Sequence, residues 1–316
     1  MVTDFLLFNK LAELNREMTP ERLFHEKGVG AYGEFYLYMP FSDYTKADFL
    51  NNPEESTEVF VRFSRALGRR GSAETARDVR GMCTKFFTAG GDYDLMCQNM
   101  PVFFIKEAKK FPDLYDALRP QNGLSFDREK FWKFMSDNPE AFHLILWLFS
   151  NKGTIKSYRH MESFSVNTYI WRNQKNKIFY VRYQWMPLAG IQNIPSQEAE
   201  FLAGYDPDAL TNDLYNAIED GIYPEYELSV QIIPENAAKE FPFDIFDKTL
   251  TWPERACPHI KVGKLILNRL PSSFHDEVEL CYFSPSHVVP GIEIPEDEML
   301  ALMCFSHDEE WRNRRR

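Results

Sequence analysis

Histidines are the side chains of this sequence whose surroundings could most readily support catalysis or metal binding. His25 stands in the segment RLFHEKGVGAYGEF, just before the closely spaced Gly28, Gly30 and Gly33, which would let the backbone pass near a flat or bulky group. His307 stands near the C-terminal end, in the segment MCFSH. An imidazole can ligate a metal and can move a proton at neutral pH. On these residues alone, a structural histidine and an ordinary glycine-rich turn explain the pattern better than a catalytic site does.

Cysteine usage and charge exclude several classes of protein. Five scattered cysteines, without a CxxC pair or a Cys/His ligand spacing, indicate neither a disulfide framework nor a zinc site, so we expect a reducing, cytoplasmic setting. The net charge of −11 argues against binding to nucleic acid or to an anionic membrane surface. The charged start MVTDFLLFNKLAELNREM predicts an amphipathic helix over 1–17 and not a signal peptide. The longest apolar run, AFHLILWLF, is too short to span a bilayer.

The periodicity of apolar residues predicts a β core with appended helices, an α+β chain without linkers that forms one domain over 1–316. Helices are expected between the strands, and the last one covers 295–316 with Pro295 in its first turn. About eight strands are expected, in the segments YGEFYLYM, EVFVRFS, CTKFFTAGGDYDLM, PVFFIK, SFSVNTYIW, IFYVRYQW, YELSVQIIP and VGKLILNRL. The other expected helices are AKKFPDLYDALR, DREKFWKFMSDN, PEAFHLILWLFS and DPDALTNDLYNAIEDG.

Several long blocks of the sequence resemble the corresponding blocks of heme catalases, in order and at the spacing of that family. They include RLFHEKGVGAYGEF, VRFSRALGRRGSAETARDVRGMCTKFFT, NMPVFFIKEAKKFPD, SYRHMESFSVNTY, FPFDIFDKTLTWP and PGIEIPEDEML. The resemblance runs from about residue 18 to the end. It implies an antiparallel eight-stranded β-barrel with surrounding helices and a buried heme b. It also implies that the wrapping segment and C-terminal domain of full-length catalases are missing, as in mini-catalase relatives.

The same resemblance assigns roles on the distal side of the heme. His25 matches the distal histidine, which takes a proton from the near oxygen of a bound peroxide and returns it to the far one. Ser64 matches the serine that orients this imidazole. Phe111 matches the phenylalanine packed on the heme face, and Phe103 lies on the distal wall.

Three arginines match positions that bind the heme propionates, where a bidentate guanidinium suits a carboxylate. They are Arg22, Arg62 and Arg314. Without the resemblance, Arg314 would belong to a solvated basic tail, and the other two could equally be surface ion pairs.

Two distal positions depart from the family. Gln98, in LMCQNMP, replaces the distal asparagine and is one methylene longer, so a peroxide would be held differently. Asn99 could take over only if the alignment slipped by one residue. Phe24 replaces the small residue that precedes the distal histidine, and its ring would narrow or redirect access to the iron.

The proximal side departs further. Catalases carry an RxFxY-type pattern there, with a tyrosinate on iron, whereas this sequence has Met303 at the arginine position and His307 at the tyrosine position. A phenol titrates near pH ~10, so a tyrosinate ligand needs a neighbouring cation, while a neutral imidazole does not. We therefore expect His307 to be the iron ligand. There are two alternatives. Cys304 could ligate the iron as a thiolate, or iron ligation could be lost and His307 exposed on the helix.

The support behind the proximal ligand also changes. Gln184 replaces a histidine of the family, although Asp297 is retained. We expect the side-chain oxygen of Gln184 to accept a hydrogen bond from the second ring nitrogen of His307.

These residues predict a peroxidase-like or peroxygenase-like oxidoreductase, which uses hydrogen peroxide or an organic hydroperoxide to oxidise a small organic substrate. A neutral histidine ligand is typical of peroxidases and globins. The alternatives are a hydroperoxide isomerase or lyase resembling catalase-related allene oxide synthases, residual catalase activity, and a non-catalytic protein that binds heme or a diatomic gas. A homodimer is expected.

Overall fold

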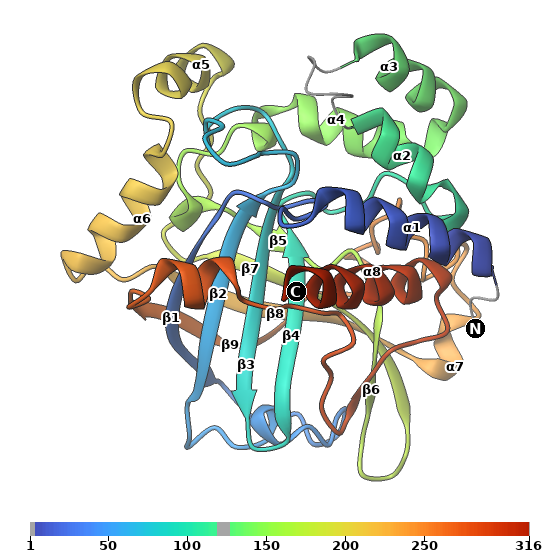
Figure 1. Cartoon of the computed structure of the whole chain (residues 1–316). Helices are drawn as coiled ribbons and strands as arrows, with labels where there is room; N and C mark the ends of the chain where they lie inside the picture. The colour runs from blue at the N-terminus through green and yellow to red at the C-terminus, as the bar shows by residue number, and fades with distance from the viewer. Residues whose placement is uncertain (1–3, 119–126, 316) are drawn as a thin grey trace.

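A closed antiparallel barrel dominates the computed structural model, which describes residues 4–118 and 127–315 (Figure 1). Around the barrel the strands follow the order β7–β5–β4–β3–β2–β1–β9–β8, and β8 pairs with β7 to close the ring. β6 and β10 extend the sheet from β7. The strands are β1 (Gly28–Leu37), β2 (Thr57–Arg65), β3 (Arg80–Thr88), β4 (Gly91–Gln98), β5 (Ser163–Phe164), β6 (Tyr169–Arg172), β7 (Ile178–Pro187), β8 (Glu225–Pro234), β9 (Ile260–Arg269) and β10 (Ile292–Glu293). The predicted eight-stranded barrel is confirmed.

The barrel interior is filled because β-branched and aromatic residues alternate along the strands. Val29 and Ala31 of β1, Val61 and Phe63 of β2, and Leu95 of β4 are fully buried in one hydrophobic cluster. The tight packing of β1 against its neighbours explains its glycines. A Cβ atom at Gly33 would lie 2.0 Å from the carbonyl oxygen of Ile266 in β9.

The expected reason for those glycines is therefore wrong. A Cβ at Gly30 would lie 2.4 Å from the ring of Phe60, so the close approach is to the protein's own side chains. None of the three glycines borders the cavity described below.

One predicted strand is also wrong, and two others are divided. The segment PVFFIK, residues 101–106, forms no strand, because Pro101 cannot donate to a ladder and the chain turns across the barrel mouth. There the backbone N–H of Phe103 donates to the carbonyl of Lys248 over 2.7 Å. The segment CTKFFTAGGDYDLM divides into β3 and β4, and the segment SFSVNTYIW divides into the short strands β5 and β6.

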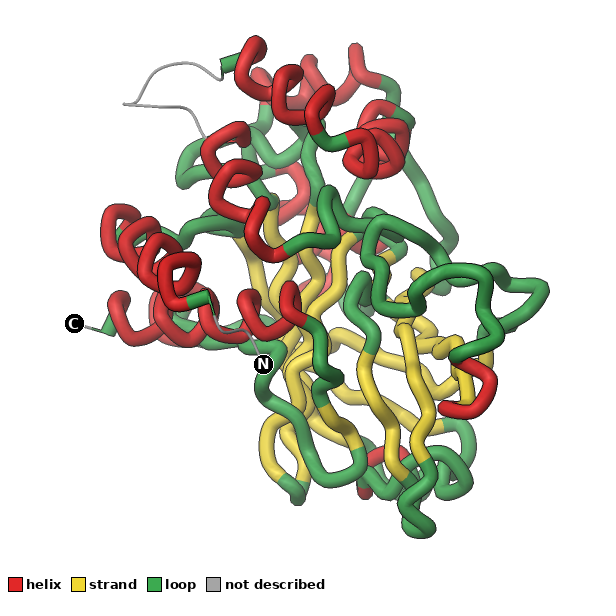
Figure 2. Tube along the Cα trace, turned by 90° about the vertical axis from the view of Figure 1, so that its right-hand side faces the viewer, coloured by secondary structure: helices red, strands yellow, loops and turns green. Residues whose placement is uncertain are grey.

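Helices gather over one end and one side of the barrel (Figure 2). α1 and α8 lie side by side, and the amide of Asn15 on α1 donates to Ser306 Oγ on α8 over 3.4 Å. No helix among the described residues is long and apolar enough to cross a membrane. The helices are α1 (Phe5–Met18), α2 (Phe111–Leu118), α3 (Arg128–Asp137), α4 (Phe142–Phe149), α5 (Ser196–Tyr205), α6 (Ala209–Glu219), α7 (Glu235–Ala238) and α8 (Glu298–Arg314), with a π-helical turn at Phe274–Glu279.

The start of α8 is set by a side-chain cap. Asp297 is the N-cap, and its Oδ1 accepts the backbone N–H of Leu300 over 2.9 Å. Pro295 therefore lies ahead of the helix and not in its first turn, as the sequence had suggested. Residues 1–3 and 316 of the two predicted terminal helices lie outside the described residues, as does the end of the helix expected at AKKFPDLYDALR.

Candidate active site

A cavity of about 630 Å³ lies where the barrel mouth meets the helices, a volume typical of sites for small molecules and cofactors. Its walls are largely apolar and come from segments far apart in the sequence. They include Phe24 and His25 ahead of β1, Gly81, Met96 and Gln98 on β3 and β4, Phe103, Phe104 and Phe111 after β4, and Met303, Ser306, His307 and Glu310 on α8. The two histidines that the sequence singled out thus face the same space.

His25 is held in a defined orientation. Its Nδ1 lies 2.9 Å from Ser64 Oγ, and its backbone adopts a left-handed conformation with φ +61°. Gly81 makes room for this pair, because a Cβ there would lie 2.9 Å from Ser64 Oγ and 3.0 Å from His25 Cε1. Burial, assisted by Arg62, lowers the pKa of His25 to about 3, so the imidazole is neutral at pH 7.

Gln98 uses both hydrogens of its amide within the protein. Nε2 donates to the carbonyl of Val102 over 2.7 Å and to that of Met100 over 3.2 Å. A reversed amide would set Oε1 against two carbonyl oxygens, so this orientation is the one the loop allows. Gln98 therefore offers a bound molecule an acceptor and no donor.

The aromatic residues of the distal side form a wall. Phe24 packs edge-on against Phe111, with ring centroids 6.0 Å apart, and against Tyr115, with centroids 5.5 Å apart. Phe103 packs edge-on against Phe104. These contacts fix the bulk of Phe24 beside His25.

α8 presents one face to the cavity. Met303, Ser306, His307 and Glu310 follow the i, i+3, i+4, i+7 spacing of a helix face. Within residues 4–118 and 127–315 no group forms a hydrogen bond with the ring of His307, so its nitrogens are available to a ligand. Burial lowers the pKa of His307, and Glu310 partly opposes this effect. An imidazole that stays neutral keeps the lone pair that ligation needs.

Cys304 lies off this face. It is not among the residues that line the cavity, and burial raises the pKa of its thiol to about 12. A thiolate ligand is accordingly disfavoured.

The expected support from Gln184 is not formed. Gln184 lies in β7, where its backbone pairs with Phe164 and Ser229, and no hydrogen bond joins it to His307 among the described residues. Asp297 is committed elsewhere: it caps α8 and forms an ion pair with Lys248, whose side chain is only 1% exposed. The charged support that a tyrosinate would require is absent from the described part of this side.

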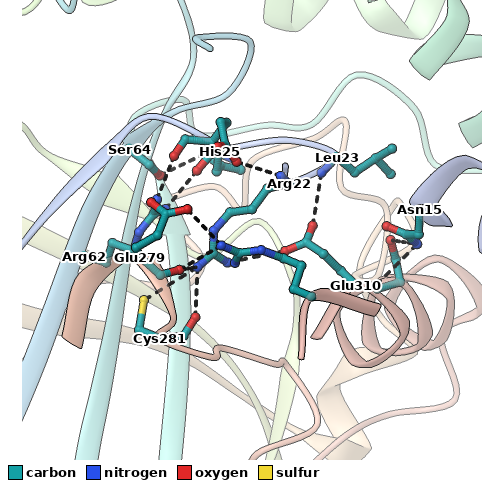
Figure 3. Close-up of polar contacts among 12 residues, drawn as sticks. Asn15, Arg22, Leu23, His25, Arg62, Ser64, Glu279, Cys281 and Glu310 are labelled. Carbon is teal, nitrogen blue, oxygen red and sulfur yellow. Dashed lines mark hydrogen bonds and ion pairs between the residues drawn. The ribbon is translucent and has the colours of Figure 1, made fainter. Parts of the chain in front are cut away.

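Arg22 and Arg62 lie close to Glu310 of α8 (Figure 3), and Arg314 joins them because it donates, as Arg22 does, to the carbonyl of Glu279. Arg62 donates to the carbonyls of His25 over 2.9 Å and Glu26 over 3.0 Å. Arg22 donates to the carbonyls of Glu279 and Cys281 and lies 3.3 Å from Glu310.

Carboxylates that the sequence analysis did not single out complete this group. Glu279 lies 2.9 Å from Arg314, and Arg70 bridges Glu279 and Glu26. Glu310 could have been found from the sequence, because it lies three residues after His307 on the same helix face. Glu279 could not, because only the closed fold brings it to Arg22 and Arg314.

These residues fit an iron porphyrin. The cavity is apolar, a histidine with a free ring nitrogen lines it from the barrel side and another from α8, and guanidinium groups lie beside one end. The Nε atoms of Arg22 and Arg62 are buried without a hydrogen-bond partner in the described structure, which leaves donors for an anionic group.

The fold of this chain matches that of solved catalase structures. The structure superimposes on a fungal catalase with a TM-score of 0.91 at 38% identity, covering 99% of this chain and 63% of the other. Catalase A from Saccharomyces cerevisiae gives the same TM-score at 37% identity, with 99% and 65% covered.

Sequence comparison gives the same family. The family described as Catalase matches residues 1–315. The chain is 44% identical over 308 residues to a catalase of Methanosarcina barkeri, covering 97% of this chain and 61% of the relative. It is 42% identical over 312 residues to a catalase of Alkalihalophilus pseudofirmus (97% and 46% covered) and 43% identical over 316 residues to a bromoperoxidase-catalase of Streptomyces venezuelae (99% and 65%). The chain belongs to the catalase family, and it spans about half to two-thirds of the length of these relatives.

Proposed function

We propose that this chain binds heme with His307 as the iron ligand and uses hydrogen peroxide or an organic hydroperoxide to oxidise an organic substrate. The observation that carries the proposal is the placement of His25 and His307 on one apolar cavity, with His25 held by Ser64. A heme bound there would supply the redox chemistry of its iron, and the protein supplies orientation and proton transfer.

His25 acts as the proton carrier. Nδ1 is engaged with Ser64 Oγ; in the tautomer that protonates Nδ1, Nε2 carries the lone pair, and the lowered pKa keeps this lone pair free at neutral pH. Nε2 accepts the proton of a peroxide from one oxygen and returns it to the other, which leaves as water or as an alcohol. The aromatic wall around Phe24 limits the access of water to this transfer.

The altered residues favour an organic electron donor over a second molecule of H2O2. Gln98 has no free N–H with which to hold a second peroxide. His307 binds as a neutral imidazole, and the residue one turn before it, Met303, is apolar. A neutral histidine ligand is typical of peroxidases and globins.

The test compares donor oxidation with oxygen release. Heme-reconstituted protein is mixed with H2O2 in the presence and absence of guaiacol, and oxidised guaiacol and dissolved oxygen are followed together. The proposal expects oxidised donor as the main product. Oxygen release without donor oxidation would indicate a catalase and would contradict the proposal, as would inertness toward H2O2 and toward cumene hydroperoxide. Conversion of a fatty-acid hydroperoxide without any donor, with no guaiacol oxidation, would indicate an isomerase or lyase instead.

A further inference from the structure

Seven charged side chains form a connected cluster next to Glu310 on the cavity wall, and Figure 3 labels Arg22, Arg62, Glu279 and Glu310 of this set. Four are arginines and three are glutamates, and we call this set the arginine cluster. Its members are Arg22, Arg62, Arg70, Arg314, Glu26, Glu279 and Glu310. Six of them are largely buried, and only Arg70 is well exposed, with 61% of its side chain accessible.

Two of the three arginines expected to bind cofactor carboxylates already have carboxylate partners. Arg314 lies 2.9 Å from Glu279 Oε1 and also donates to the carbonyl oxygens of Pro20 and Glu279. Arg22 lies 3.3 Å from Glu310 Oε1 and donates to two carbonyl oxygens.

Arg62 is the exception. In the described residues its guanidinium contacts only carbonyl oxygens, those of His25 and Glu26, and its Nε is buried and unpaired. Burial and the neighbouring Arg22 lower the pKa of Arg62, as expected for a cation without a compensating anion.

The charge balance of the cluster is one net positive charge. Three guanidinium groups pair with the three carboxylates, and Arg62 joins the cluster only through the backbone carbonyl of Glu26, so a single positive charge remains uncompensated. An uncompensated charge in a largely buried site is unfavourable, and so is an excess of the opposite sign. The site therefore matches an incoming group with one negative charge.

On the side of the cavity, Glu310 supplies one of the three negative charges of the arginine cluster. It lies on α8 three residues after His307 and lines the cavity. Both of its oxygens are used, since Oε1 faces Arg22 and Oε2 accepts the backbone N–H of Leu23 over 3.2 Å. Arg22 does not itself line the cavity, so its contact with the cavity wall runs through the Glu310 carboxylate.

We infer that Glu310 is a built-in carboxylate that replaces one ligand carboxylate at Arg22, so that this end of the cavity binds a porphyrin through a single ionised carboxylate. The inference rests on the proposed heme binding and concerns the charge of the ligand that the site accepts. A porphyrin with two ionised carboxylates must displace Glu310 or leave one carboxylate outside the cluster, whereas a monocarboxylate need do neither.

The experiment measures whether the apoprotein prefers a porphyrin with one ionised carboxylate or a porphyrin with two. Hemin and hemin monomethyl ester are titrated into the wild-type protein and into Glu310→Gln, and dissociation constants are taken from porphyrin absorbance and tryptophan quenching. The measured quantity is the affinity for hemin relative to the monoester. Glu310→Gln raises the net charge of the cluster by one, so this relative affinity should rise by about tenfold.

Two further variants make the result specific. Glu309→Gln removes a charge from the adjacent residue of α8, which pairs with Arg312 and does not line the cavity, and should leave the relative affinity at the wild-type value. Arg22→Gln combined with Glu310→Gln removes both partners, restores the net charge and should also return the wild-type value. The double variant tests the inference even if the single one unfolds.

The outcomes separate this inference from the proposed function. A rise of less than about threefold in folded Glu310→Gln, or a double variant that differs from wild type by more than that, would overturn the inference (a factor of three is well below one unit charge). Guaiacol oxidation is measured on the same hemin-loaded samples. If it is normal while the relative affinity does not shift, the charge inference alone fails; if it is absent while the affinity shifts, the proposed function alone fails.

Discussion

The barrel wall and helix α8 face the same cavity but differ in how firmly the fold determines their chemistry. On the barrel wall, Ser64 and Gly81 are directly paired residues of β2 and β3, so the hydrogen-bonding register itself places the hydroxyl beside His25. On α8, the cavity face carries Met303 and His307, whose identities no backbone contact dictates. His25, which we propose as the distal histidine, therefore shares one cavity with His307, which we propose as the iron ligand.

The anchoring of α8 explains this freedom. Met299, Leu300 and Leu302 are fully buried on the side that packs against the protein, and Asp297 fixes the start of the helix. The side chains that face the cavity can then change without altering the path of the helix. Under the proposed function, the sheet positions the proton carrier His25, whereas the proposed iron ligand His307 lies on a helix face whose residues can be replaced.

The largest expected effect concerns the barrel wall. His25→Ala should slow the reaction with peroxide by about 10²–10⁴-fold, because the proton carrier is lost, while the heme spectrum stays that of the wild type. Stopped-flow absorbance after mixing with H2O2 measures the rate. His160→Ala, whose ring contacts only the carbonyl of Gly190 at the surface, is the matched control and should react normally. An unaltered rate in His25→Ala would show that His25 is not the proton carrier.

The second prediction concerns the anchoring of α8. Lys248→Met leaves Asp297 buried without its cation and should lower the free energy of unfolding by about 3–5 kcal/mol. Lys261→Met removes an exposed lysine that pairs with Glu227 and should change it by less than about 0.5 kcal/mol. Urea denaturation of the apoproteins gives both values. Equal stability of the two variants would show that the ion pair does not anchor the helix.

A smaller effect is expected at Gly81. The methyl group of Gly81→Ala would lie 2.9 Å from Ser64 Oγ and should destabilise the protein by about 1–3 kcal/mol while turning His25 out of position. The helical Gly204 has open space around its Cβ, so Gly204→Ala should instead be neutral or stabilising by up to about 1 kcal/mol. Thermal unfolding and the peroxide rate are compared for the two; a normal peroxide rate in Gly81→Ala would contradict the geometry given for Ser64 and His25.

The smallest expected effect is the pH dependence that His25 adds to stability. The unfolded imidazole takes up a proton below pH ~6.5, whereas the folded one does so only near pH 3, so stability is present above pH ~6.5 and is lost as the pH falls toward 3. One pH unit below 6.5 the loss amounts to about 1 kcal/mol. His25→Gln apoprotein should therefore lose less stability than wild type between pH 7.5 and 5.5. Parallel unfolding curves for the two proteins would mean that His25 is not buried as a neutral group.

Much of the fold follows from the sequence because the strands carry clear alternation. Long segments such as IFYVRYQW and YELSVQIIP became β7 and β8 as expected. The segment PVFFIK misled because an apolar run that crosses a barrel mouth has the same composition as a strand. Only the hydrogen bond from Phe103 to Lys248 distinguishes the two, and it joins residues far apart in the chain.

In the candidate site, too, some features could be predicted from the sequence and others could not. His25, Ser64 and His307 could be proposed from matched blocks, and the structure brings all three to one end of the barrel. The ion pair of Arg22 with Glu310 could not, because it joins residues 288 positions apart. For the same reason the hydrogen bond expected at Gln184 was wrong: a strand residue can match a family position and still not reach the helix.

The most direct test of the account is the absorption spectrum of heme-reconstituted protein in the ferric and ferrous-CO forms, recorded for wild type, His307→Ala and Cys304→Ala. The account predicts histidine-type bands in the wild type, their loss in His307→Ala and no change in Cys304→Ala. Bands that persist in His307→Ala, or that change only in Cys304→Ala, would contradict ligation by His307.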